Sequence, residues 1–278
     1  MSKVAFFDKA LIEQFQKTVS AISMILSLII IFIDIPNAYK LLTGIAFIVV
    51  LIIVYFVLWI RSNNLKHIDI DVEGSQVIIK EGDIFVEEGL KAIAFNDYFD
   101  TQVDNVLIAK KSLNGIFIEN YLDSSVELLD KFIDNDKFVS QAIIGENPSR
   151  VLGKKIRYKI GTICLYGDYL LTSFAKFDDS NKAILTMPEY LEFLINFWDQ
   201  VNSVYAQQSV SVPIFGSGIT RIKGHKTISD EDLLKIMLWT FRISEMRFKY
   251  PAKLSIIVHK DKMKTINLFD IKSSKNGI

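Results

Sequence analysis

The sequence is poor in the residues that form disulfides and metal centres. It contains one cysteine, Cys164, and three histidines among 278 residues. A single cysteine cannot form an internal disulfide, which is typical of a reducing compartment. The histidines, His67, His225 and His259, belong to no Ser-His-Asp spacing and to no cluster with metal-ligand spacing. The sequence therefore predicts neither a bound metal nor a catalytic triad.

An excess of charge and a P-loop are also missing. The 32 basic residues balance the 32 acidic residues, so the formal net charge is zero. A neutral chain has no broad electrostatic attraction to nucleic acid, and we expect no nucleic-acid partner. No glycine-rich loop is followed by Gly-Lys-Ser or Gly-Lys-Thr, which excludes the common nucleotide-triphosphate motif.

What the chain does have is an N-terminus with long apolar runs. Residues 41–60 contain no charge, and residues 18–33 form a second uncharged run bounded by Lys17 and Asp34. A helix of about 20 residues spans about 30 Å, the thickness of the hydrocarbon core of a bilayer. The connection between the runs contains Pro36 and Asn37 and is long enough only for a tight turn. We predict a two-helix transmembrane hairpin over residues 18–61.

The flanks of this hairpin indicate its orientation. More basic residues lie outside the hairpin than in its turn, so the positive-inside rule places both ends in the cytoplasm. Residues 1–17 form a short amphipathic segment that could lie in the headgroup region or on a neighbouring subunit. Ser20, Ser23 and Ser27 share one face of the first helix. This face suits packing within the hairpin, a seam between subunits or the lining of a pore.

From residue 66 onward, strands alternate with helices. Strands are expected at 68–72, 77–79, 90–96, 157–164, 169–177, 209–215 and 254–258, with an edge strand at 265–269. Helices are expected at 126–138, 188–208 and 230–247. This alternation predicts an α/β sandwich around a mostly parallel or mixed sheet. We assign the soluble domain to residues 66–271 and a tail to residues 272–278.

Three loops of this domain follow predicted strands. They cover residues 82–84, 96–104 and 216–220. Open α/β sheets bind ligands in the crevice at the carboxyl ends of their strands. Two glycines, Gly216 and Gly218, would let the backbone approach a phosphate and present its N–H groups, although an ordinary turn has the same composition.

The motifs in these loops resemble those of macro domains, which bind ADP-ribose and its derivatives. The resemblance rests on the Gly82-Asp83-Ile84 turn, on Asn96 after a buried strand and on Val212-Pro-Ile-Phe-Gly-Ser-Gly218. It implies a three-layer α/β/α sandwich with a mixed sheet. It also implies that Asp83 accepts a hydrogen bond from the adenine amino group, and that Ile84 packs on the adenine ring. The amides of residues 216–220 would hold the diphosphate, with Asn96 beside the distal ribose. The complete set of implied ligand-binding residues is Asp83, Ile84, Asn96, Phe99, Asp100, Thr101, Phe215, Gly216, Ser217, Gly218, Ile219, Thr220 and Arg221.

One loop departs from the pattern of the hydrolytic macro domains. Those enzymes carry Asn-Ala-Ala-Asn followed by glycines, whereas this chain has the bulky segment Phe95-Asn-Asp-Tyr-Phe-Asp100. We therefore expect a binding module and not an enzyme, with the aromatic and acidic residues contacting an additional group on the ligand. The alternatives are a membrane-anchored ADP-ribosyl hydrolase and an anchored adaptor without a ligand.

The whole architecture resembles the membrane effectors of type II Thoeris anti-phage systems. Two membrane helices precede a macro-like domain with Phe95-Asn-Asp-Tyr-Phe-Asp100 and Phe177-Asp-Asp-Ser-Asn-Lys-Ala183. The resemblance implies a partner TIR-domain enzyme that consumes NAD and makes an ADP-ribose derivative, ADP-ribose joined to histidine. Binding of this signal would assemble a homo-oligomer that disrupts the lipid bilayer, so that the infected cell dies or stops growing. The implied location is the bacterial inner membrane, with no cofactor beyond the signal itself.

Overall fold

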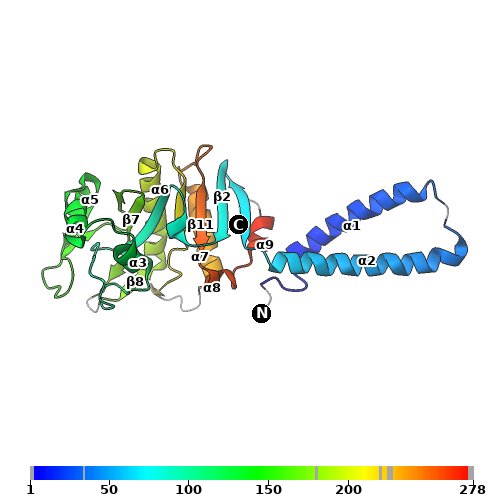
Figure 1. Cartoon of the computed structure of the whole chain (residues 1–278), viewed down its shortest axis with the longest axis horizontal. Coiled ribbons are helices and arrows are strands. Elements are labelled where there is room, and N and C mark those ends of the chain that lie inside the picture. Colours follow the sequence, from blue (N-terminus) through cyan, green and yellow to red (C-terminus); the bar gives the residue numbers. More distant parts are fainter. Residues whose placement is uncertain (1–2, 34, 179–180, 219–220, 224–227, 275–278) are drawn as a thin grey trace.

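The computed structural model describes residues 3–33, 35–178, 181–218, 221–223 and 228–274. Two long helices, α1 (Lys9–Ile30) and α2 (Asn37–Asn63), precede an α/β domain. Figure 1 shows both helices projecting together from one end of that domain. The first helix begins at Asp8, whose carboxylate accepts hydrogen bonds from the Ala10 and Leu11 N–H groups. It is continuous across residue 17, where the sequence suggested a boundary.

The outer parts of the two helices leave their apolar side chains uncovered. Phe32 is 87% exposed and Leu41 is 77% exposed. Among the described residues, α2 is the one helix that is long and apolar enough to cross a membrane, and none of its most apolar window is buried. A large apolar surface of this kind marks contact with a partner or with lipid.

The base of the helices is fixed to the N-terminal segment. Val4 and Leu11 are fully buried and pack with Phe269 of the C-terminal region. The indole N–H of Trp59 donates to the Val4 carbonyl oxygen over 3.1 Å, and the Tyr55 hydroxyl donates to the Phe6 carbonyl oxygen. These contacts tie residues 4–6 to the end of α2 that enters the α/β domain.

The main sheet is mixed, as the sequence predicts. Its centre consists of five mutually parallel strands in the order β2 (Ser75–Glu81), β11 (Leu254–Val258), β9 (Val210–Pro213), β3 (Leu90–Asn96) and β7 (Tyr169–Phe177). Antiparallel strands flank this centre: β1 (His67–Val72) pairs with β2, whereas β6 (Ile163–Tyr166) and β8 (Ala183–Thr186) pair with β7. Strand β10 (Arg221–Lys223) continues the sheet beside β8, to which it is parallel.

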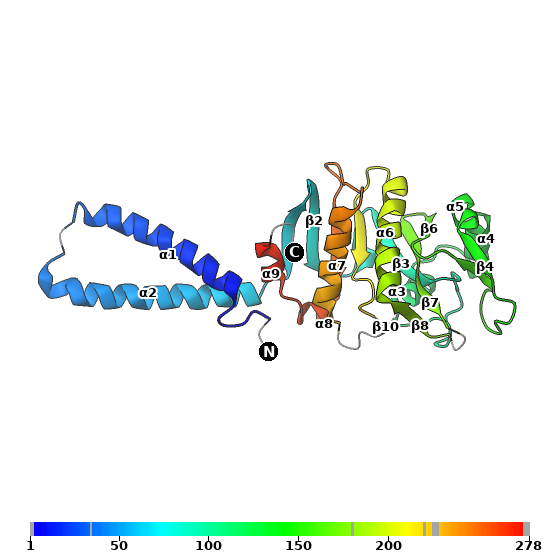
Figure 2. The same cartoon turned by 180° about the vertical axis from the view of Figure 1, so that it is seen from behind.

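Helices cover both faces of the sheet. Successive residues of a strand point to opposite faces, and Leu170 and Leu171 of β7 accordingly belong to different apolar clusters. The first cluster contains α6 (Met187–Val204) and α7 (Asp230–Ile243), and the second contains α3 (Leu113–Asn120), α4 (Val126–Asn135) and α5 (Lys137–Gln141). Figure 1 shows α3 in front of the sheet, and Figure 2 shows α6 and α7 in front from the opposite side. The three-layer α/β/α sandwich is confirmed.

Several local predictions were wrong. The expected edge strand at 265–269 is helical, because Asn267 caps α9 (Leu268–Ser273) after the short helix α8 (Lys260–Met263). Leu268 and Ile271, three positions apart, then face the core together. The helix expected at 126–138 breaks at Asp136, whose side chain caps α5. The strand expected at 157–164 is divided between β5 (Ile156–Tyr158), which pairs with β4 (Ile143–Glu146), and β6.

Candidate functional site at the carboxyl edge of the sheet

The structure brings the three predicted loops to one edge of the sheet. Strands β2, β3 and β9 belong to the parallel centre, so the segments that follow them emerge on the same side. The segment after β2 forms a single 3-10 turn, η1 (Ile84–Val86), which lies against β9. Residues 84–86 therefore lie beside residues 210–213, although about 125 residues separate them in the sequence, and residues 214–218 follow at the same edge.

Asp83 stands at the exposed start of η1. One of its carboxylate oxygens, Oδ1, accepts the Phe85 N–H over 3.0 Å and so fixes the turn. The following residue, Ile84, is 3% exposed and packs into the second apolar cluster. The pair therefore combines a surface carboxylate with a buried apolar side chain next to it.

The loop after β9 is anchored to the core at Phe215 and uncovered at Gly218. The Tyr190 hydroxyl donates to the Phe215 carbonyl oxygen over 2.9 Å, and the Phe215 ring is only 1% exposed. Gly216 adopts a positive φ of 85°, a conformation that favours glycine. Among the described residues, a Cβ atom built on Gly218 would meet no heavy atom within 4 Å. The described residues therefore leave the Gly218 backbone uncovered on its Cβ side, with Ser217 between the two glycines.

Three predicted residues of this loop lack a described side chain. The predictions for Ile219 and Thr220 lie outside the described residues, and so does the side chain of Arg221, which begins β10.

The turn after β3 is organised by Asn96. Its side-chain oxygen accepts the N–H groups of Tyr98 and Asp100, each over 3.1 Å. Its amide nitrogen donates to Asp100 Oδ2 over 2.8 Å. Asn96 is 4% exposed, so the structure places it as the centre of the turn, with its hydrogen-bonding groups used internally.

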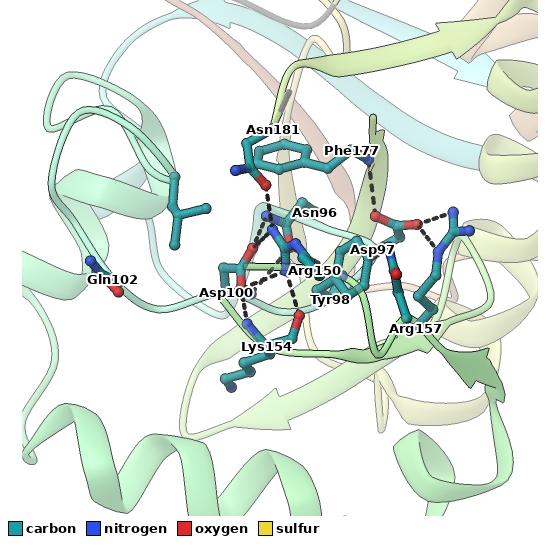
Figure 3. A network of polar contacts seen from close by, with 12 residues as sticks. Asn96, Asp97, Tyr98, Asp100, Gln102, Arg150, Lys154, Arg157, Phe177 and Asn181 are labelled. Carbon is teal, nitrogen blue, oxygen red and sulfur yellow. Dashed lines mark hydrogen bonds and ion pairs between the residues drawn. The ribbon is translucent and has the colours of Figure 1, made fainter. Parts of the chain in front are cut away.

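Asp100 is paired with Arg150 inside the domain. Their side chains are 1% and 6% exposed, and the two guanidinium nitrogens lie 3.1 and 2.6 Å from the two carboxylate oxygens. The Lys154 N–H also donates to Asp100, over 2.7 Å. Figure 3 shows this cluster, with the guanidinium group lying over the Tyr98 ring at 3.8 Å from its centroid. A bidentate, fully hydrogen-bonded pair of this kind tolerates burial.

A second carboxylate of the same turn is held by another arginine. Asp97 Oδ2 accepts two hydrogen bonds from Arg157, over 2.9 and 2.6 Å, and Oδ1 accepts the Phe177 N–H over 3.1 Å. Burial raises the pKa of Asp97 above its usual value, while the bonds from Arg157 and Phe177 oppose that shift. Asp97 thereby joins the ends of β3 and β7 (Figure 3).

The Phe99 ring is turned away from solvent. The residue has a positive φ of 48° and is fully buried against Phe95 and Tyr158, at centroid distances of 6.0 and 5.3 Å. The structure thus places this predicted ligand contact in the apolar core, where it supports the turn.

A cavity of about 610 Å³ adjoins the turn on the side of α3 and α4. Its walls include Asp100, Thr101, Asp130 and Lys154. Thr101 donates to Asp130 Oδ1 over 2.8 Å, and the Lys154 ammonium lies 2.6 Å from the same oxygen. Of the predicted site residues that the structure describes, only Asp100 and Thr101 line this cavity, whereas Asp83 and residues 215–218 do not.

Sequence reasoning missed the two arginines. Arg150 and Arg157 lie 50 and 60 residues beyond their carboxylate partners. No local pattern marks either one, because their pairing depends on how the segment 147–158 returns to the end of β3. The acidic residues of the turn were the available signal, since buried carboxylates require basic partners.

Comparison with known proteins assigns this domain to a class. Residues 77–259 match the family model described as "Thoeris protein ThsA, Macro domain". Among solved structures, a single-residue variant of the Oceanobacillus iheyensis macrodomain with ADPR has 12% sequence identity and a TM-score of 0.49, over 74% of this chain and 97% of that one. The same macrodomain with ADP has 12% identity and a TM-score of 0.43, over 74% and 95% of the two chains. The domain that carries the site is a macro domain.

A curated relative covers nearly the whole chain. The Thoeris protein ThsA of Bacillus amyloliquefaciens (strain Y2) is 38% identical over 257 residues, which span 91% of this chain and 86% of the relative. This chain belongs to the ThsA family of Thoeris proteins.

Proposed function

We propose that this protein is a membrane-anchored receptor for an ADP-ribose-derived signal and acts as the effector of a type II Thoeris anti-phage system. A partner TIR-domain enzyme would make the signal from NAD, with histidine as the group joined to ADP-ribose. Binding would favour a homo-oligomer that disrupts the inner membrane and so arrests or kills the infected cell. The observation that carries the proposal is a ThsA-family macro domain joined directly to two helices with uncovered apolar surfaces.

The edge loops support binding of an ADP-ribose group. The exposed Asp83 carboxylate would accept a hydrogen bond from the adenine amino group, with Ile84 as its apolar support. The open backbone at Gly218 would face the diphosphate, where main-chain N–H groups complement negative charge. The distal ribose and its attached group would lie toward the Asn96 turn and the cavity beyond it.

The carboxylates of the turn favour binding over hydrolysis. Both oxygens of Asp97 and both oxygens of Asp100 accept hydrogen bonds from fixed donors in the same domain. Neither group is positioned as a free general base, which would need to reach a water or a substrate proton.

The proposed topology has both helices in the bilayer and the macro domain in the cytoplasm. The length of α2 suits one crossing, and α1 with the turn after it leaves a comparable row of apolar side chains uncovered. A crossing by the shorter helix, α1, is compatible with local thinning of the bilayer.

Calorimetry on the full chain in detergent micelles tests the binding site. ADP-ribose and histidine-linked ADP-ribose are the probes, and Asp83→Ala should weaken binding about 10- to 100-fold, the loss of one hydrogen bond to a charged group. Asp69→Ala removes an exposed carboxylate from β1 and is the matched control. Gly218→Val should obstruct the diphosphate, while Gly145→Val, at another open glycine, should not. Equal affinity in all four variants would show that the ligand does not bind at the proposed site.

An activity assay separates the receptor from the hydrolase alternative. The full chain is incubated with ADP-ribosylated protein, and free ADP-ribose is measured. Efficient release would assign the protein to the hydrolases, whereas binding without release supports the receptor.

A further inference from the structure

Helix α7 is packed directly beneath the loop that we assign to the diphosphate. A Cβ atom built on Gly216 would lie 3.5 Å from Leu233 Cδ1. Leu233 is 2% exposed and belongs to the first turns of α7, which Ser229 and Asp232 cap reciprocally. Gly216 and Leu233 are therefore near neighbours, and a displacement of the Gly216 backbone would alter the packing of the loop on α7.

The same turns of α7 hold the C-terminal helices by polar contacts. Glu231 Oε2 accepts the Asn267 N–H over 2.8 Å. The Lys235 ammonium lies 2.9 Å from Glu231 Oε1 and 2.7 Å from Asp270 Oδ2, and so links α7 to α9. Burial disfavours its charge, but the hydrogen bonds that Lys235 donates to Asp270 and Glu231 outweigh burial and raise the pKa of Lys235. The link therefore stays ionic at neutral pH.

Helix α9 joins the domain to the membrane helices. Leu268 and Ile271 face the core of the domain, whereas Phe269 packs with Val4 and Leu11 at the base of α1 and α2. Figure 1 shows α9 between the sheet and the two long helices. A six-residue helix with one face in the core and another on the hairpin cannot move without changing contacts on both sides.

We propose that α7 and α9 transmit occupation of the ligand site to the membrane helices. The transmission path runs from Gly216 through Leu233 to Lys235, from there to Asp270, and through Phe269 to Leu11. The inference rests on the proposed function and adds its regulation. The Lys235–Asp270 contact is the step at which ligand binding is coupled to the hairpin.

The path explains how a ligand can act at a distance. A ligand shifts an equilibrium only by its different affinities for the two states. A Gly216 loop drawn toward the diphosphate would change its packing against Leu233, and the ion pair between α7 and α9 would pass this change to Phe269 on the hairpin. Coupling free energies between sites correspond to about 5- to 150-fold in affinity. Loss of the link should therefore reduce the membrane response without abolishing ligand binding.

Leakage from liposomes containing the full chain measures the coupling. ADP-ribose and histidine-linked ADP-ribose are added to vesicles with an entrapped fluorophore, and binding is measured separately in detergent. For Lys235→Met and Asp270→Asn we expect leakage to fall about tenfold, with affinity in detergent within about twofold of the original. The double variant should lose no more than Lys235→Met alone, since all three variants remove the Lys235–Asp270 contact.

Two controls keep a structural defect apart from a coupling defect. Lys235→Arg retains a cation between the two carboxylates and should restore leakage. Lys264→Met removes an exposed ion pair with Asp261 on α8 and should change nothing. Full leakage from Lys235→Met and Asp270→Asn, with normal binding, would overturn the transmission path alone. If the unmodified chain binds neither probe, or binds without leakage, the proposed function fails and the path fails with it.

Discussion

Removal of Arg150 is expected to destabilise the macro domain strongly. Arg150 is the main partner of Asp100, and the carboxylate is 1% exposed. Substitution by methionine keeps much of the side-chain volume but leaves the charge of Asp100 inside the domain without its cation. Breaking a buried ion pair by removing one partner typically costs about 3–5 kcal/mol. That is a large part of a total stability on the order of 5–15 kcal/mol.

The remaining contacts of Asp100 place the expected loss of stability at the lower end of this range. The Asn96 amide and the Lys154 N–H continue to donate to the carboxylate, over 2.8 and 2.7 Å. Arg150 also covers the Tyr98 ring, so methionine retains only the apolar part of that contact. We therefore expect a loss of about 3 kcal/mol for Arg150→Met.

Urea unfolding of the full chain in detergent, followed by fluorescence, measures this loss. Trp198 is fully buried and reports on the core of the domain. With a denaturant dependence of about 1–3 kcal/mol per molar urea, the midpoint should fall by about 1 M or more. Lys66→Met, which removes an exposed pair with Glu81, should change the free energy of unfolding by less than about 1 kcal/mol. If Arg150→Met and Lys66→Met unfold at the same midpoint, the argument from the buried charge is refuted.

Three further predictions concern other parts of the domain. Burial raises the pKa of Glu189, but hydrogen bonds from Lys176 and Thr186 prevail and lower it from 4.5 to about 2. The Glu189 carboxylate thus stabilises the folded state fully above pH 4.5, and this stabilisation is lost as the pH falls toward 2. Glu189→Gln should therefore lower the free energy of unfolding by on the order of 1 kcal/mol at pH 7 and by nothing near pH 2. Unfolding measured as a function of pH tests this. Burial raises the pKa of Cys164 to about 12, and a thiol reagent at pH 8 should label it only after unfolding, whereas native labelling would contradict the structure. Gly161→Ala should lower the unfolding temperature by several degrees, because the φ of Gly161 is 87° and the new Cβ would lie 2.5 Å from Asn196 Cβ. An unchanged unfolding temperature would show that α6 can shift to make room for the methyl group.

The sequence predicted the layers of the fold because they depend on local periodicity. Residues 90–96 are buried on both faces, as expected of an inner parallel strand, and β3 has these bounds in the structure. The helix from Met187 to Val204 was recognisable from its apolar side and its start at Pro188. The wrong edge strand at 265–269 shows the limit of such reasoning. A short apolar segment fits a strand or a helix equally well. Here the helix forms because it buries Leu268 and Ile271 together in the core.

The candidate site could likewise be predicted only in part. The loops after β2, β3 and β9 were visible in the sequence, because glycine and acidic residues mark turns and parallel strands place their ends on one edge. Their support was not visible, since Arg150, Arg157 and Tyr190 reach the loops across long sequence separations. Pairing of this kind depends on the relative positions of whole elements, which no local pattern encodes.

The sequence by itself determined that the chain joins uncharged apolar helices to an α/β domain with glycine-containing loops, because hydrophobic length and periodicity are local properties. Only the tertiary structure decided which distant segments meet, both within the domain and at its junction with the helices. It placed Asp97 and Asp100 in closed ion pairs and put α9 between Lys235 and the base of the hairpin. Such contacts form because burying apolar surface forces distant segments together, and each buried charge among them then requires a partner.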